Sequence, residues 1–138
     1  MEANIKWIDG VNFSALTESG NTILMDGPVE NGGNNNGSRP TELLISGMGG
    51  CTAFDIVCMA KTKKIKIKKF NLKINAQRTN SKPSLINKIH CTYIIDSDEK
   101  NKDDLEKIIQ SSLNKHCSCC IVLGKAIDIS YSLELISS

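Results

Sequence analysis

The sequence predicts an α+β domain with strands and helices in the order β-β-β-α-β-β-α-β. Several short segments alternate between apolar and polar residues, which is typical of strands with one buried face. A stretch from residue 40 to about 64 is apolar on several faces of a helix. A second stripe of apolar residues recurs at helical spacing between about 101 and 117. Because no repeat or second module interrupts this order, we expect a single domain over residues 1–138.

Composition excludes several protein classes. With 138 residues, the chain is long enough to bury roughly two-thirds of its unfolded surface without disulfide or metal staples. Its 17 basic and 15 acidic residues leave a net charge of +2, too small to argue for a nucleic-acid or membrane partner. The sequence shows no apolar run of the roughly 20 residues that cross a bilayer, and no signal-peptide pattern at the start. We therefore expect a cytoplasmic protein.

The first 25 residues are predicted to form three strands. Turn signals at Asp9-Gly10 and Ser19-Gly20-Asn21 divide the segment, and a three-stranded meander is the simplest arrangement. The alternating apolar positions of the middle strand are Val11, Phe13, Ala15 and Thr17. Residues 26–38 contain mostly turn-forming residue types, including many Gly and Asn, and are expected to form a long mobile loop.

A central helix is predicted from Pro40 to about Lys64. Pro40 suits the first helical position, and the charge of Glu42 favours the helix amino terminus. Its apolar residues are Leu43, Leu44, Ile45, Met48, Ala53, Phe54, Ile56, Val57 and Met59. Because these lie on several faces, we expect the helix to be buried nearly all round, at the centre of the fold or of an oligomer, so that a stable monomer is not expected.

The remaining elements follow from the same patterns. Strands are predicted over 67–77 and about 89–95, a helix from Asn101 through Cys117, and a last strand over 127–135. The apolar strand positions are Phe70, Leu72, Ile74, Ala76, Ile89, Cys91, Tyr93, Ile95, Ile127, Ile129, Tyr131, Leu133 and Leu135. The lysine-rich run over 61–69 joins a helix end to a strand and is interpreted as a solvated edge rather than an anion site.

Among the six cysteines, Cys51 is the candidate nucleophile. It follows Gly47, Gly49 and Gly50 within the predicted helix, where each glycine costs roughly 1 kcal/mol relative to alanine. Either another helix crosses closely there, or a substrate approaches the backbone beside the thiol, with Gly47 on the same face as Cys51. The alternative is that Cys51 is a small core residue, like Cys58 and Cys91.

The activation of Cys51 requires a cation, because Asp55 lies one helical turn later and a carboxylate raises the pKa of a nearby thiol. The chain has only two arginines, Arg39 and Arg78. Arg39 precedes Cys51 by twelve residues, about 18 Å along a helix that rises roughly 1.5 Å per residue. The charge must therefore come from a chain that folds back or from a second subunit.

Cys117 is the candidate partner of Cys51. It ends the second predicted helix on its apolar stripe, where the helix dipole raises the pKa of a thiol and suits a resolving role. A thiol peroxidase needs such a pair: the first cysteine becomes a sulfenic acid and the second condenses with it. His116, Cys117, Cys119 and Cys120 are an alternative metal site. All four lie in one segment, which disfavours a zinc centre, and we expect no metal or other cofactor.

The segment from Arg39 to Asp55 resembles the OsmC/Ohr family of thiol-dependent peroxidases and redox proteins, particularly its YhfA-like branch. Residues 6–10, 23–27 and 115–118 are similar to that branch as well. The resemblance implies an intertwined homodimer with two central helices between curved sheets and active sites at the subunit interface. It also implies that Cys51 attacks a hydroperoxide, that Cys117 resolves it, and that a cellular dithiol recycles the pair.

Two positions depart from the organic-hydroperoxide branch. A glutamate directly follows the proline of that branch's motif, where this chain has Thr41, and its catalytic arginine lies on the amino-terminal hairpin, where this chain has none. Arg39 and Glu42 are therefore the candidate activating residues. Asp55, Gly47 and Gly50 complete the candidate substrate-binding set. A non-enzymatic ligand- or metal-binding stress protein of the same fold is the alternative function, and Cys119 and Cys120 have no assigned role.

Overall fold

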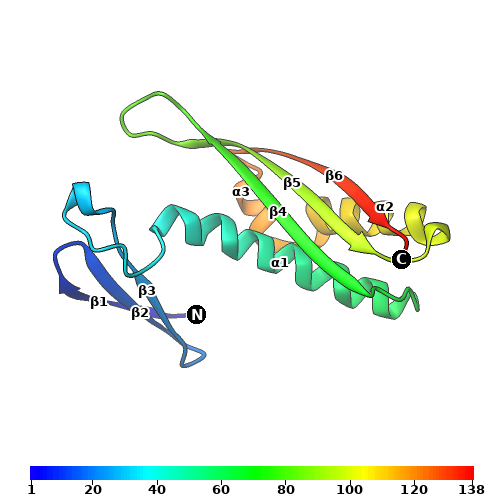
Figure 1. The fold of residues 1–138 in the computed structure, drawn as a ribbon, viewed down its shortest axis with the longest axis horizontal. Helices are drawn as coiled ribbons and strands as arrows, with labels where there is room; N and C mark the ends of the chain where they lie inside the picture. The colour runs from blue at the N-terminus through cyan, green and yellow to red at the C-terminus, as the bar shows by residue number, and fades with distance from the viewer. The chain divides into compact units, whose positions relative to one another are not determined.

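The computed structural model describes residues 1–138, and the chain divides into two compact units, residues 1–46 and 47–138. The first unit contains three antiparallel strands, β1 (Ala3–Asp9), β2 (Asn12–Thr17) and β3 (Thr22–Met25), in the order β1-β2-β3 (Figure 1). The predicted meander is confirmed. The prediction of a single domain over the whole chain stays a prediction.

The loop between β3 and the first helix is folded around one carboxylate. Asp26 is only 2% exposed, and its oxygens accept the backbone N–H groups of Gly27 at 2.7 Å, Asn34 at 3.1 Å and Asn36 at 3.0 Å. The N–H of Asn36, ahead of the other two, lowers the pKa of Asp26, although burial opposes it. The segment expected to be a mobile loop is thus an ordered one.

The long helix, α1 (Pro40–Thr62), begins at the predicted proline. The carboxylate of Glu42 accepts the backbone N–H of Arg39 at 3.0 Å, which satisfies one of the unpaired donors at the helix start. The expectation of burial all round is wrong for the single chain. Buried residues fall on one stripe, Met48, Gly49, Thr52, Ile56 and Ala60. One sheet covers only one side of a helix, and Phe54 on the other side is 69% exposed.

By length and composition, α1 would also be sufficient to cross a membrane. The expectation that the sequence has no apolar run of about 20 residues is therefore corrected. The few polar residues within α1 do not make it too polar to cross a membrane. The core helix of a soluble protein can have the same length and composition. In this structure, α1 contacts β4 at Gly49 and β5 at Thr52.

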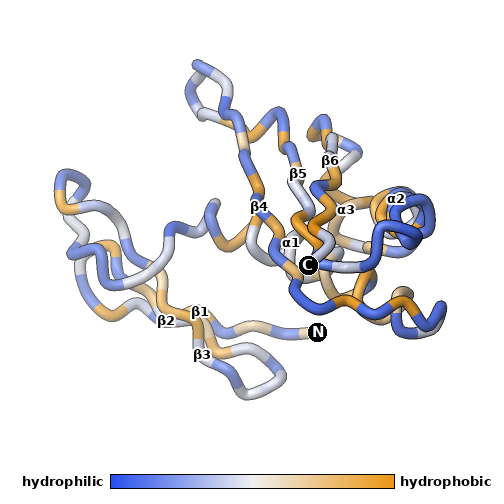
Figure 2. Tube along the Cα trace, turned by 45° about the vertical axis from the view of Figure 1, so that its right-hand side comes forward, coloured by the Kyte–Doolittle hydropathy of each residue, from blue (hydrophilic) through white to orange (hydrophobic).

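The second unit contains the sheet β4-β5-β6, with β4 (Lys69–Arg78) antiparallel to β5 (Ile86–Asp96) and β5 parallel to β6 (Asp128–Ile136) (Figure 1). The predicted apolar positions share one face: Leu72 pairs with Tyr93, and Tyr93 pairs with Leu133. This face packs on the helices, whereas the tip of the β4–β5 hairpin is hydrophilic (Figure 2). The alternation predicted for all three strands is confirmed.

The connection from β5 to β6 contains two helices instead of the one predicted. The helix α2 (Lys102–Ser111) ends earlier than expected and continues as a π-helical turn over Ser112–His116. A short helix that the sequence did not predict, α3 (Ser118–Leu123), then follows. Cys117 stands between them with an extended backbone, and its sulfur accepts the N–H of Cys120 at 3.4 Å. Cys117 therefore caps both segments: it follows the π turn that continues α2, and it is the N-cap of α3.

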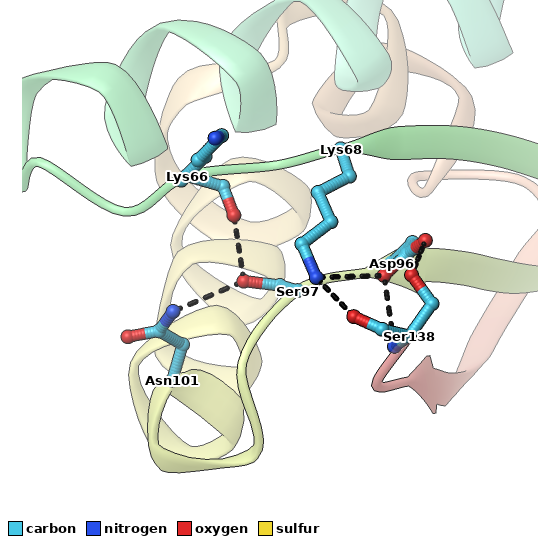
Figure 3. A network of polar contacts seen from close by, with 6 residues as sticks. All are labelled: Lys66, Lys68, Asp96, Ser97, Asn101 and Ser138. Atoms are coloured by element: carbon cyan, nitrogen blue, oxygen red, sulfur yellow. Dashed lines mark hydrogen bonds and ion pairs between the residues drawn. The ribbon is translucent and has the colours of Figure 1, made fainter.

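Polar contacts close the end of the sheet where β5 and β6 finish. Figure 3 shows the six residues involved, which are Lys66, Lys68, Asp96, Ser97, Asn101 and Ser138. Asp96 accepts the Ser138 hydroxyl at 2.6 Å, and this bond lowers the pKa of Asp96. The hydroxyl of Ser97 donates to the Lys66 carbonyl at 2.8 Å. The lysine-rich segment thus joins the sheet through a backbone carbonyl, that of Lys66. Lys68 Nζ lies 4.0 Å from Asp96 Oδ1, and the other lysine side chains of the segment are exposed.

Candidate functional site

Cys51 lies on α1 directly after two glycines that have different roles. A Cβ on Gly49 would come within 2.5 Å of Ile74 Cδ1, so this glycine lets α1 approach β4 closely. At Gly47 and Gly50 a Cβ would meet nothing within 4 Å, and both positions are exposed. The two readings of the glycine motif therefore apply to different residues: packing explains Gly49, whereas Gly47 and Gly50 leave open space beside Cys51.

Five of the six cysteines form a cluster in the second unit. Cys51 and Cys119 are half-buried, whereas Cys91, Cys117 and Cys120 are buried. Cys117 is 0% exposed. The side chains of Cys117 and Cys119 both lower the pKa of Cys51, so the three thiols are neighbours. Cys51 and Cys117 therefore belong to one cluster, together with Cys119. The interpretation of Cys58 as a core residue is wrong, because Cys58 is exposed on α1.

The pKa of Cys51 is lowered from its ordinary value. The backbone N–H of Cys119, in the first turn of α3, contributes most, followed by the thiol of Cys117, while partial burial opposes both. Hydrogen-bond donors stabilise a thiolate in the same way as they stabilise a carboxylate, so a larger share of Cys51 is ionised near neutral pH. The backbone donor could not be found among charged side chains, because it belongs to α3, a helix that the sequence did not predict.

Cys117 has the opposite character. Burial raises its pKa most, and the side chain of Cys120 adds to this effect, whereas the backbone N–H of Cys120 opposes it. The direction agrees with the prediction for a resolving thiol. Cys117 does close the π turn that continues α2, but removal from water, rather than the helix dipole, is the main cause of its raised pKa.

Behind Cys51, a chain of hydroxyl groups links α1 to β5 and to the π turn. The Thr52 oxygen lies 2.9 Å from both Tyr93 Oη and Ser112 Oγ, and Ser112 donates to Asp55 Oδ2 at 3.1 Å. Each hydroxyl has one proton, so donation runs from Tyr93 through Thr52 and Ser112 to the carboxylate. Asp55, predicted as part of the substrate-binding set, is the terminal acceptor of this chain.

Arg39 and Glu42 have partners within the first unit. The Arg39 guanidinium donates to Asn35 Oδ1 at 2.8 Å and to the carbonyls of Gly37 at 3.3 Å and Asp26 at 3.4 Å. Glu42 caps the start of α1 through the N–H of Arg39. Both residues thus order the loop and the helix start, and their role as activating residues stays a prediction.

The metal-site alternative gains no support from the geometry. No three or more His, Cys, Asp or Glu side chains are arranged so that they could hold a metal ion. The His116 side chain, one of the four candidate ligands, is exposed, whereas Cys117 and Cys120 are buried. The candidate site is therefore a group of thiols and hydrogen-bond donors.

Comparisons with known proteins agree with this fold. The family model for OsmC-like protein matches residues 32–132. Protein YhfA of Escherichia coli (strain K12) is 29% identical over 141 aligned residues, and the alignment covers 100% of both chains.

Solved structures show the same architecture. An OsmC-like protein from Mycoplasma pneumoniae superposes with a TM-score of 0.80 at 17% identity, covering 98% of this chain and 96% of the other. An organic hydroperoxide resistance protein OsmC from Legionella pneumophila superposes with a TM-score of 0.72 at 17% identity, covering 97% of each chain. The match over residues 32–132, together with the α+β fold, shows that the chain belongs to the OsmC-like protein family.

Proposed function

We propose that this protein is a thiol-dependent peroxidase-like redox protein of oxidative stress defence, which reduces organic hydroperoxides through Cys51 and Cys117. The observation that supports this most is the pairing of two thiols of opposite character. Cys51 is half-buried with a lowered pKa, and Cys117 beside it is fully buried with a raised pKa. The similar Legionella pneumophila structure, named an organic hydroperoxide resistance protein, supports hydroperoxides as the substrate class.

In the proposed reaction, the Cys51 thiolate attacks one oxygen of the hydroperoxide. The O–O bond breaks, the alkoxide leaves as an alcohol after taking a proton, and Cys51 becomes a sulfenic acid. The sulfur of Cys117 then attacks the sulfur of Cys51, which forms a disulfide and releases water. A dithiol reductant returns both cysteines to thiols by two exchange steps, and no metal or other cofactor takes part.

Each half of the pair suits its step. The donors around Cys51 stabilise the attacking thiolate, chiefly the N–H of Cys119. A buried Cys117 stays a thiol until Cys51 has been oxidised, so it does not compete for peroxide. Gly47 and Gly50 leave space beside Cys51 in which an apolar hydroperoxide would lie.

The working form proposed here is a homodimer. Exposed positions of α1 recur at spacings of three and four residues, forming a stripe of Gly47, Gly50, Phe54 and Val57. Such spacing is that of a helix face that packs on another helix, and Phe54 and Val57 are its large apolar side chains. A second copy of α1 would cover Phe54, which the single chain leaves in water.

The cytoplasm is the proposed location. The six cysteines are all free thiols, and a reducing compartment would keep them so and supply a dithiol to recycle the pair. The proposal includes no nucleic-acid or membrane partner.

The test is the consumption of cumene hydroperoxide with dithiothreitol as the reductant. The wild-type protein should turn over, Cys51→Ser should not, and Cys58→Ser, which changes an exposed thiol on the same helix, should keep full turnover. Equal rates for wild type and Cys51→Ser would refute the proposal. A wild-type protein that consumes no hydroperoxide but binds an apolar molecule stoichiometrically would favour a non-enzymatic binding protein.

A further inference from the structure

A groove lies between α1 and α2, outside the cluster of thiols around Cys51. Its volume is about 400 Å³, and its walls include Cys58, Met59 and Lys63 from the end of α1 and Lys107 and Ile108 from α2. This volume is within the range of roughly 300–1,000 Å³ that is typical of pockets for small ligands. We propose that this α1–α2 groove binds a medium-chain monocarboxylate, with its alkyl chain on Met59 and Ile108 and its carboxylate at Lys107 and Lys63.

The inner wall of the α1–α2 groove is apolar. Ile108 is only 2% exposed, and Met59 is half-buried, so both side chains form a wall that is fixed by packing on the rest of the second unit. Cys58 is exposed beside them and adds a third weakly polar side chain. An alkyl chain that lies against this wall would leave water and cover the exposed part of Met59, which favours binding through the hydrophobic effect.

The rim of the α1–α2 groove is positively charged. Lys63 and Lys107 are exposed, and none of the three ion pairs in the structure involves either ammonium group. A second hollow of about 240 Å³ shares Lys107 with the groove and is also lined by Lys115. No acidic residue lines the groove or this hollow. The ammonium groups at the rim are therefore free to pair with the charge of a bound anion.

The combination of these two surfaces selects the class of ligand. A neutral apolar molecule would leave Lys63 and Lys107 without a counter-charge, and a small anion such as acetate would leave the wall of Met59 and Ile108 in water. A carboxylate that carries an alkyl chain matches both. The chemistry of the groove is thus that of a site for an amphipathic anion.

The groove is separate from the proposed peroxidase site. Cys51 does not line it, and Cys58, the cysteine that does, follows Cys51 by seven residues, about 10 Å along the helix. The inference therefore goes beyond the proposed function and does not depend on it. Cys58 also supplies a local probe, because a bound ligand would shield its thiol from a reagent.

The experiment measures the alkylation of Cys58 by iodoacetamide in the presence of decanoate below its micelle concentration. The Cys51→Ser protein is used, because Cys58 is then the only cysteine in its tryptic peptide and no peroxidase activity is needed. Decanoate should slow the alkylation of Cys58 to a saturating limit. Decan-1-ol, which has the same chain without the charge, should protect at higher concentrations, and acetate should not protect.

Lysine variants test the position of the carboxylate. The decanoate concentration that gives half-maximal protection should rise about threefold or more in Lys107→Gln and in Lys63→Gln, since each change removes one ion pair. Lys73→Gln, which removes an exposed lysine on the outer face of β4, is the matched control and should not change it. Rates with and without decanoate are compared within each variant, so that any effect of a lysine on the thiol itself cancels.

Three results would overturn the inference. Decanoate might leave the alkylation of Cys58 unchanged, which would show that nothing binds in the groove. Equal protection by decanoate and decan-1-ol, or an unchanged midpoint in both Lys107→Gln and Lys63→Gln, would show that the lysines do not recognise a carboxylate. Protection that increases with protein concentration and not with decanoate would assign the groove to a second copy of the chain.

Discussion

The hydroxyl oxygens of Thr52 and Ser112 lie 2.9 Å apart in the buried interior of the second unit. Thr52 directly follows Cys51 on α1, and the carbonyl of Ser112 accepts the N–H of Cys117 at 2.8 Å. One contact between two small side chains therefore joins the helix of Cys51 to the turn that leads to Cys117. π-Helical turns such as the one that begins at Ser112 are frequent at functional sites.

Replacement of Thr52 with valine tests this link. The change keeps the shape of the side chain but removes the hydroxyl between Tyr93 and Ser112, which leaves the fully buried Tyr93 hydroxyl without its partner. An unpaired buried hydroxyl costs about 1–3 kcal/mol, so the free energy of unfolding in urea should fall by that amount. Thr92→Val, a half-buried threonine on the opposite face of β5, is the matched control and should change little. Equal stability of Thr52→Val and wild type would contradict the role given to the hydroxyl chain.

The lowered pKa of Cys51 predicts its pH dependence. The rate of alkylation by iodoacetamide follows the thiolate fraction, so the rate at Cys51 should level off at a lower pH than that of a cysteine in the unfolded chain. Cys117→Ala removes one of the donors and should move the profile to higher pH, whereas Cys117→Ser retains a hydroxyl donor and should move it less. A Cys51 profile that matches the unfolded chain would show that the donors have no effect.

Asp26 predicts an acid-sensitive loop. Its pKa in the folded protein is lowered, chiefly by the N–H of Asn36, relative to about 3.9 in an unfolded chain. The stabilisation is therefore fully present above the unfolded pKa and is lost as the pH falls through the folded one. The protection of Asn34 and Asn36 against amide hydrogen exchange, relative to the intrinsic rate at each pH, should fall below about pH 4, and in Asp26→Asn it should be low already at neutral pH. Unchanged protection in Asp26→Asn would exclude the carboxylate as the organiser of the loop.

The exposed stripe of α1 predicts the state of association. Phe54 is 69% exposed in the single chain, and under the homodimer proposal a second copy covers it. Phe54→Asp would place a charge in that contact and should convert a dimer into a monomer, as measured by light scattering with size-exclusion chromatography. Asn71→Asp, an exposed residue on the outer face of β4, is the control that adds the same charge elsewhere. A wild-type monomer, or a dimeric Phe54→Asp, would refute this arrangement.

The strands and the start of α1 could be predicted because their signals are local. The alternation around Tyr93 sets which side chains share a face, and the observed pairing with Leu72 and Leu133 reproduces it. Pro40 and Glu42 mark the start of the helix through its unpaired N–H groups, as observed. Signals of this kind depend only on backbone geometry and on which face of an element is apolar.

The activation of Cys51 could not be predicted in the same way. The helix α3 has six residues with no apolar period, and its role depends on a cap at Cys117 that only the folded chain shows. The N–H of Cys119 therefore escaped a search for charged side chains. Burial of α1 was overestimated at Phe54 for a related reason: an apolar pattern indicates that a residue is to be covered, but not by which chain.

The number of thiols lost per hydroperoxide tests the central claim most directly. The reduced protein has six cysteines, which a thiol reagent can count after denaturation. One equivalent of cumene hydroperoxide should remove two thiols in wild type and leave one equivalent of the alcohol, while Cys51→Ser should lose none and leave the hydroperoxide intact. Six titratable thiols in wild type beside unchanged hydroperoxide would contradict the account of Cys51 as a peroxide-reducing thiol.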